Sequence, residues 1–230
     1  MTRLTFELPD HEQVAVTVHT LLNAGYAGRS QADVAAHIAE LAELGVPAPT
    51  RIPCIYPIAP YLAMQIDEVP VQHECTSGEA EWALVVAGTD PSELLLTAAC
   101  DHTDRRLEQH GVAWSKQAAP DVLARQAWRL TDVADRIDEL TLTGSVQTEA
   151  GPQVIQHGTL AELLTPMYWA EELSARKLLI PGTILMSGTI PMRTEVDQFS
   201  TGWNVELSDP RTSQSISLSY TVRQTPPPVD

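Results

Sequence analysis

The sequence predicts an α+β fold that contains more strand than helix. Most of the chain consists of short segments in which apolar residues alternate with polar ones or run together, as in strands buried on one face or on both. Helical periodicity is confined to a few short segments. Strands and helices also do not alternate regularly, which argues against a doubly wound parallel sheet.

Composition limits the class of function. The chain has 230 residues, of which 43% are hydrophobic, enough for one domain, with or without a small appendage, that buries a core. It carries 30 acidic against 14 basic residues, for a formal charge of −16. Because this charge repels phosphate groups, we expect no nucleic acid and no anionic membrane as partner. The chain also has no run of about 18 apolar residues and no apolar segment typical of a signal peptide.

The three cysteines, Cys54, Cys75 and Cys100, are widely and irregularly spaced. This pattern fits neither a disulfide framework nor a thiolate zinc site. We therefore expect reduced thiols in a cytoplasmic protein, with Cys100 acting as a small buried side chain.

Residues 1–50 are predicted to form an N-terminal unit made of a hairpin and a helix. Residues 4–8 and 14–18 alternate between apolar and polar side chains and are joined by a Pro-Asp turn. Residues 31–44 form the clearest helix, because Ser30 is a good N-cap and an acidic residue follows it three positions later. The apolar stripe of this helix consists of Val34, Ile38 and Leu41.

The main body is predicted to span residues 51–223, followed by a disordered tail at 224–230 that contains three consecutive prolines. Five prolines in the fourteen residues 47–60 indicate an extended connector near the boundary. No dinucleotide, Walker or nucleophile-elbow motif is present, which disfavours nucleotide binding and serine-hydrolase chemistry. Strands are predicted at 81–87, 93–100, 140–148, 154–157, 183–189, 204–207 and 215–222. Short helices are predicted at 104–110, 133–139 and 166–176.

A Glu-x-Glu pair and a following aspartate are candidate metal ligands. In a strand, Glu79 and Glu81 point to the same face, and two carboxylates so close repel unless a cation or proton lies between them. Asp101 follows an apolar strand and could add a third oxygen ligand, a set that suits Mg²⁺ or Mn²⁺. The alternatives are a solvated strand edge for the glutamates and N-capping for the aspartates, which we favour for Asp104. His102 could be a further ligand, but we expect it to lie in an exposed turn.

Three further groups could carry chemistry. His37 and Glu40 are three apart on the predicted helix, and such a pair could activate water, although surface pairs of this kind are common. Lys116 lies in a moderately apolar stretch, with an exposed charge as the alternative. Gly188 and Thr189 end a predicted strand, where backbone N–H groups and a hydroxyl could hold a carboxylate, or where the glycine could simply make a tight turn.

The order of these motifs resembles that of the fumarylacetoacetate hydrolase superfamily over roughly residues 30–223. The chain looks closest to a bacterial branch of that superfamily that is known only as a domain of unknown function. The motifs that carry the resemblance are His37-Ile-Ala-Glu40, the Pro-rich segment at 47–53, Glu79-Ala-Glu81, Asp101-His-Thr-Asp-Arg105, Lys116 and Pro181-Gly-Thr followed by Gly188-Thr189.

The resemblance implies a mixed β-roll or sandwich-like fold with short peripheral helices, assembled as a homodimer. It implies a divalent ion, Mg²⁺ or Mn²⁺, held by Glu79, Glu81 and Asp101. The implied activity is hydrolysis of a C–C bond in a small 2-oxo-acid or β-dicarbonyl acid. His37 and Glu40 would activate water. The remaining implied site residues are Lys116, which would stabilise an enolate or orient the substrate, and the substrate-binding residues Arg29, Arg105, Gly188 and Thr189.

The sequence also departs from the superfamily pattern. Ile58 stands where a lysine usually follows the Pro-rich segment, Arg106 replaces an aspartate, and Gln117-Ala118 replaces a Phe-Asp pair. These changes leave the metal ligands intact but remove the basis for assuming one substrate. A lyase, either an oxo-acid decarboxylase or a hydratase, on the same metal site is therefore the alternative. A non-catalytic ligand-binding protein of the same fold is the second alternative.

Overall fold

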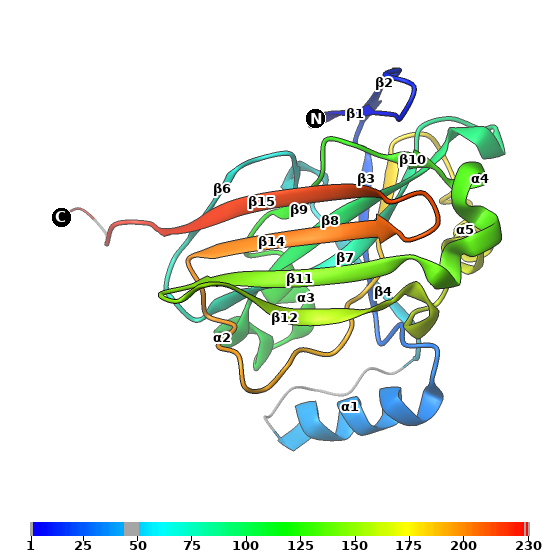
Figure 1. Cartoon of the computed structure of the whole chain (residues 1–230). Coiled ribbons are helices and arrows are strands. Elements are labelled where there is room, and N and C mark those ends of the chain that lie inside the picture. The colour runs from blue at the N-terminus through cyan, green and yellow to red at the C-terminus, as the bar shows by residue number, and fades with distance from the viewer. Residues whose placement is uncertain (1, 44–50, 228, 230) are drawn as a thin grey trace.

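Two packed β-sheets form the body of the molecule in the computed structural model (Figure 1). The structure describes residues 2–43, 51–227 and 229. One sheet has eight strands and the other has five, and a separate two-stranded hairpin lies near the N-terminus. This arrangement confirms the prediction of a mostly β fold with few short helices.

The chain begins with the predicted hairpin, β1 (Arg3–Glu7) and β2 (Gln13–Thr17), which pair antiparallel. Strand β3 (Thr20–Gly25) follows and was not predicted, although four of its six residues are buried. The predicted helix is present as α1 (Gln31–Glu43). Ser30 Oγ accepts a hydrogen bond from the backbone N–H of Asp33 at 3.3 Å, as expected of an N-cap.

The eight-stranded sheet has the order β4-β3-β13-β7-β8-β9-β5, with β10 paired to β8. Its centre is the antiparallel pair β7 and β8, each of 11 residues, which extend well beyond the predicted strands. Besides β3, its strands are β4 (Cys54–Ile58), β5 (Ala63–Met64), β7 (Thr76–Val86), β8 (Leu94–Asp104), β9 (Asp121–Leu123), β10 (Trp128–Arg129) and β13 (Thr183–Met186).

The five-stranded sheet has the order β12-β11-β14-β15-β6. Burial alternates strictly along β14, so that Trp203, Val205 and Leu207 are buried while their neighbours along the strand are not. The bounds are β6 (Glu68–Val71), β11 (Thr141–Thr148), β12 (Gly151–Thr159), β14 (Gly202–Asp209) and β15 (Gln214–Gln224). Four of these strands were predicted, with bounds that differ by a few residues.

Short helices connect the strands. The predicted helix at 166–176 is α5 (Pro166–Ala175), capped by the Thr165 hydroxyl and with proline in its first turn. The other helices are α2 (Arg105–Glu108), α3 (Val112–Lys116) and α4 (Leu130–Val133). Three-residue 3-10 turns lie at Pro60–Leu62, Pro91–Glu93 and Leu160–Glu162, and a longer, kinked 3-10 segment spans Ala134–Glu139.

The two faces of the eight-stranded sheet bury different cores. One face packs on the five-stranded sheet, where Trp82 belongs to the same apolar cluster as Leu142 and Val205. The other face carries a second cluster, in which Ala83 and Leu95 pack with the N-terminal hairpin. Farther along β7 and β8, this second face changes from apolar to acidic side chains.

This second face is concave. Asn23 of β3 donates a hydrogen bond from Nδ2 to Asp101 Oδ2 of β8 at 3.0 Å. Three strand-to-strand steps separate β3 from β8 in the sheet order, which would span about 14 Å in a flat sheet. The sheet must therefore curl, and the curl brings polar side chains from distant strands together.

The Pro-rich segment contains a strand of the main sheet. Strand β4 lies inside residues 47–60 and pairs with β3 at the edge of the sheet, with Pro57 opposite Leu22. An edge strand tolerates proline because one side of the strand has no neighbour, so the N–H that proline lacks need not be part of a hydrogen bond between strands. The predicted boundary at residues 50–51 borders residues 44–50, which lie outside the described residues, as do parts of the predicted tail at 224–230. The division into units at these positions stays a prediction.

Candidate metal centre

Three acidic side chains face each other across adjacent strands on the concave face. Glu79 of β7 lies directly opposite Asp101 of β8, and Asp101 lies opposite Asp121 of β9. Glu81 is two residues beyond Glu79 and shares its face. Each of Glu79, Glu81 and Asp101 has a carboxylate oxygen within 4.8 Å of the others. The three residues predicted as metal ligands therefore converge.

The cluster is almost completely withdrawn from solvent. Glu81 and Asp101 are 0% exposed and the Glu79 side chain is 14% exposed. Two cations accompany them. Lys116 Nζ contacts Asp101 Oδ2 and lies 3.3 Å from Glu79 Oε2, while Arg105 Nη2 donates to Glu79 Oε1 at 2.9 Å. Lys116 is itself buried at the end of α3, so the alternative of an exposed lysine is wrong.

Arg105 is anchored on three sides. Besides Glu79, it binds Glu108 Oε2 at 3.1 Å and donates from Nε to Ser77 Oγ at 2.7 Å. The helix that begins at Arg105 is capped by Asp104, whose side chain accepts hydrogen bonds from the two N–H groups that follow Arg105. This confirms the favoured N-capping role of Asp104. It also places Arg105 at the start of this helix, where its side chain reaches Glu79.

Burial and neighbouring charges shift the pKa values in opposite directions. Burial raises the pKa of the Glu79 carboxyl, but Lys116 and Arg105 outweigh burial and lower that pKa to about 2. Burial raises the pKa of Glu81 well above its usual value. The Lys116 cation acts to lower this pKa, but the charges of Asp101 and Glu79 act in the same direction as burial. Burial lowers the pKa of Lys116, but the three acids outweigh it and raise that pKa. Lys116 is therefore held as a cation.

These residues fit a hard divalent cation. The three acids and Asp121 are accompanied by two cations, Lys116 and Arg105. Arg105 also forms an ion pair with Glu108. Within the described residues Glu81 Oε1 has no hydrogen-bond partner. Burial disfavours the ionised form of Glu81, and a divalent cation would stabilise that form by supplying positive charge. The ligand atoms are all oxygens, which is the set that Mg²⁺ and Mn²⁺ prefer.

Gly188 and Thr189 lie beside the cluster and support it. The Gly188 backbone N–H donates to Glu81 Oε2 at 2.9 Å, and its φ of 79° lies in the left-handed region that favours glycine. The Thr189 hydroxyl donates to Ala80 O at 2.8 Å and accepts from Gln156 Nε2 at 2.7 Å. Both groups thus hold β7, whereas the sequence predicted contacts with a substrate carboxylate, a role that stays a prediction.

Other predicted site residues are placed differently. Arg29 binds both oxygens of Asp138, at 2.7 and 2.8 Å, and donates to Leu163 O. The structure does not bring it to the acidic cluster through any contact among the described residues. His37 and Glu40 belong to α1, but their side chains lie outside the described residues.

The prediction that His102 occupies an exposed turn is wrong. His102 is 0% exposed because β8 continues through it to Asp104, and its ring lies between the two sheets. Its two ring nitrogens are hydrogen-bonded to Tyr220 Oη at 2.9 Å and to Thr76 Oγ1 at 3.0 Å. Burial lowers the pKa of His102 to about 3, so the ring is neutral. Cys100 is buried beside it, as predicted.

Sequence reasoning missed Asn23 and Asp121. Asn23 stands in an otherwise apolar strand, and a single amide in such a strand has no local pattern that indicates a site. Asp121 follows Pro120, a pair typical of a turn. Only the pairing of β9 with β8 places Asp121 next to Asp101.

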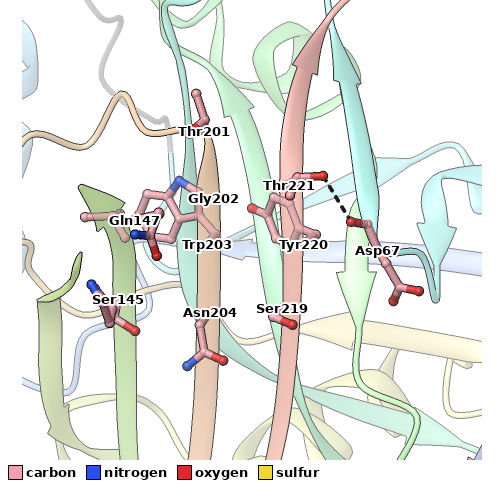
Figure 2. Close-up of a pocket in the computed structure, with 12 residues that line it drawn as sticks. Asp67, Ser145, Gln147, Thr201, Gly202, Trp203, Asn204, Ser219, Tyr220 and Thr221 are labelled. Carbon is pink, nitrogen blue, oxygen red and sulfur yellow. Dashed lines mark hydrogen bonds between the residues drawn. The ribbon is translucent and has the colours of Figure 1, made fainter. Parts of the chain in front are cut away.

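A cavity lies away from the acidic cluster, on the five-stranded sheet. Its volume is about 370 Å³, and the residues that line it include Ser145, Asn204 and Ser219. Figure 2 shows these side chains on neighbouring strands, together with the hydrogen bond from Thr221 to the backbone oxygen of Asp67. None of its lining residues belongs to the acidic cluster.

The fold and the acidic cluster together define a two-sheet β protein with a candidate divalent-cation centre on the concave face of its larger sheet. Residues 24–220 match the family described as protein of unknown function (DUF2848), and the chain belongs to this family. None of the curated proteins matches the sequence.

Solved structures with the same fold include an oxo-acid enzyme. Cg1458 with inhibitor has a TM-score of 0.63 and 16% identity, covering 92% of this chain and 79% of that one. A hexagonal crystal form of 2-keto-3-deoxyarabinonate dehydratase has a TM-score of 0.61 and 19% identity, covering 92% and 76%. The 2-keto-3-deoxy-D-arabinonate dehydratase complexed with magnesium and 2,5-dioxopentanoate has a TM-score of 0.60 and 18% identity, covering 90% and 73%. At these identities the likeness shows the fold. Within the described part of the chain, no helix has the length and apolar character needed to span a membrane.

Proposed function

We propose that this protein is a divalent-metal-dependent lyase, of the dehydratase type, acting on a small 2-oxo acid. In this proposal Glu79, Glu81 and Asp101 hold Mg²⁺ or Mn²⁺. The observation that carries it is the cluster of three converging acidic side chains, in which Glu81 Oε1 has no partner among the described residues. The fold supports placing the chain in the fumarylacetoacetate hydrolase superfamily, as its motifs imply.

The comparisons favour a lyase over the C–C bond hydrolase that the sequence first suggested. A protein of the same fold is a dehydratase of a 2-keto-3-deoxy sugar acid, and one of its structures contains magnesium. A cluster of three carboxylates on the same kind of curled sheet is suited to the same type of cofactor. Dehydration and hydrolysis of an oxo acid both pass through an enolate, so one site can serve either reaction.

A cation bound by the three carboxylates would polarise the substrate carbonyl and stabilise the negative charge that develops on its oxygen. Lys116 is held protonated by the acids around it, so it acts as a fixed positive charge and donor and not as a base. Arg105 neutralises and orients Glu79. Gly188 and Thr189 fix Glu81 and β7. We assign removal of the substrate proton to His37, assisted by Glu40 on the same helix, and propose that the chain acts as a homodimer.

The test is product analysis with metal-loaded protein. Protein freed of metal with a chelator is reloaded with Mg²⁺ or Mn²⁺ and incubated with 2-oxo acids that carry a hydroxyl on C4. Dehydration releases one water and leaves the carbon chain intact, whereas hydrolysis yields two acids and decarboxylation yields CO₂. We expect dehydration that Glu81→Gln abolishes and that Glu172→Gln, on the surface helix α5, leaves unchanged. Lack of metal binding by the unmodified protein would refute the proposal.

A further inference from the structure

A buried amide links the acidic cluster to a fourth carboxylate. Asn23 reaches across the curled sheet and shares its Nδ2 between Asp101 Oδ2, at 3.0 Å, and Asp121 Oδ1, at 3.4 Å. All three side chains are 0% exposed. Lys116 contacts the same oxygen of Asp101 as Asn23 does, so this oxygen is held from two sides.

Asp121 has no evident role in stability. It extends the row of Glu79 and Asp101 to a third strand, and burying a carboxyl group with an unpartnered oxygen costs stability. The next residue of β9 on the same face is Leu123, which packs in the second apolar cluster. An apolar side chain at position 121 would extend that cluster, so the carboxylate points to a function.

The orientation of the amide follows from its two acidic neighbours. Asp101 Oδ2 pairs with the Lys116 cation and would repel an amide oxygen, so the Nδ2 of Asn23 is the atom that lies toward Asp101 and Asp121. Within the described residues Asn23 Oδ1 and Asp121 Oδ2 have no hydrogen-bond partner. The amide oxygen of Asn23 accepts hydrogen bonds, and a hydrated cation in the adjacent cluster would supply donors.

We propose that Asn23 and Asp121 are positioning residues that orient Asp101 and thereby set the affinity of the centre for a divalent cation. This inference rests on the proposed metal site and adds residues that hydrogen-bond to one of its ligands. Groups that hydrogen-bond to metal ligands fix their geometry, and removing such a group lowers metal affinity by roughly 10–100-fold. Asn23 acts directly on Asp101, and Asp121 acts through Asn23.

The test measures Mn²⁺ binding by calorimetry and by the electron paramagnetic resonance spectrum of the bound ion. Asn23→Leu and Asp121→Leu are expected to weaken binding by roughly 10–100-fold and to change the spectrum. Asp121→Asn keeps an oxygen acceptor for Asn23 and is expected to restore most of the affinity. The control is Thr97→Val on the same face of β8, which also loses one buried hydrogen bond, to Gln126 O at 2.6 Å. It should bind Mn²⁺ as the unmodified protein does, even if its melting temperature falls.

The outcomes separate this inference from the proposed function. If the unmodified protein binds no Mn²⁺, the metal centre itself is refuted and the inference with it. If the unmodified protein, Asn23→Leu and Asp121→Leu all bind Mn²⁺ equally, the inference is overturned and the metal centre stands. Should Asn23→Leu fail to fold by circular dichroism, Asn23→Ser carries the same expectation, and equal affinity in that variant would equally overturn the inference.

Discussion

At the scale of single residues, the dominant feature is carboxylates that are buried without enough positive charge. Glu81 receives one hydrogen bond, from the Gly188 N–H, while its second oxygen has no partner among the described residues. Glu79, by contrast, is held by both Lys116 and Arg105. The two neighbouring glutamates therefore have opposite pKa shifts, and Glu81 is the member of the cluster that most needs an added cation.

Glu81→Gln tests this difference through stability. Burial raises the pKa of Glu81 well above its usual value, so the metal-free side chain is neutral and the substitution replaces it with a neutral amide of the same shape. We therefore expect the chelated variant and the chelated wild type to differ by no more than about 1 kcal/mol in the free energy of unfolding. Adding Mn²⁺ at about 100 times its dissociation constant should stabilise the wild type by about 2.7 kcal/mol and the variant not at all. Thermal unfolding with and without metal measures both effects. Equal stabilisation of the two proteins by Mn²⁺ would remove Glu81 from the ligand set.

Gly188→Ala tests the support of Glu81 by the backbone. The glycine has φ of 79°, and an added Cβ would lie 3.0 Å from Ala24 O. We expect a loss of about 1–2 kcal/mol in the free energy of unfolding, because a left-handed conformation costs this much with a side chain. Displacement of the N–H from Glu81 should also weaken Mn²⁺ binding. Chemical unfolding and calorimetry measure the two effects, and unchanged values for both would contradict the assigned role.

At the scale of elements, polar side chains join the ends of strands to the short helices. Asp209, the last residue of β14, is 2% exposed and accepts a hydrogen bond from Arg136 Nε at 2.8 Å, in the 3-10 segment Ala134–Glu139. It also accepts from Thr212 Oγ1 at 2.9 Å in the turn that leads to β15. One carboxylate thus fastens the β14–β15 turn to the segment that precedes β11.

Acid should weaken this connection. Burial raises the pKa of Asp209, but the hydrogen bonds from Arg136, Thr212 and the Arg211 backbone outweigh burial and lower the pKa below its ordinary value of 3.8. A lowered folded-state pKa gives stability that is complete well above 3.8 and is lost as pH falls through the folded-state value. We expect Asp209→Asn to cost about 2 kcal/mol at pH 7 and less at pH near 2, as measured by urea unfolding. A cost independent of pH would contradict the ionic contribution.

At the scale of the whole molecule, the second core depends on the N-terminal hairpin. Phe6 of β1 is 0% exposed and belongs to the apolar cluster that fills the concave face next to the acidic centre. Glu7 also joins the body through backbone hydrogen bonds with Arg125 and Ala127. The hairpin is therefore an integral part of the fold, although it stands at one end of the described chain.

The two phenylalanines of the chain provide a matched comparison. Phe6→Ala should cost about 3–5 kcal/mol in the free energy of unfolding, because it empties a buried site between the hairpin and the sheet. Phe199→Ala should cost little, because that side chain is 45% exposed. Denaturant unfolding of both variants tests the expectation. A small loss for Phe6→Ala would show that the hairpin contributes little to the core.

Much of the fold could be predicted from the sequence because strand and cap patterns are local. Alternation indicated the hairpin, β11, β14 and β15, and side-chain chemistry indicated the cap at Asp104. The strands missed include β3, which is buried on both faces, and β4, whose proline is unfavourable in strands. His102 was misplaced because burial depends on how far β8 extends, which its pairing with β7 decides.

For the candidate site, the sequence by itself determined that Glu79 and Glu81 share one face, since strand geometry repeats every two residues. Only the tertiary structure decided what meets them. The pairing of β7, β8 and β9 aligned Glu79, Asp101 and Asp121, and the curl of the sheet brought Asn23 across to Asp101. Those contacts join residues far apart in the chain, so they depend on the energy of the entire folded sheet and leave no trace in any short segment.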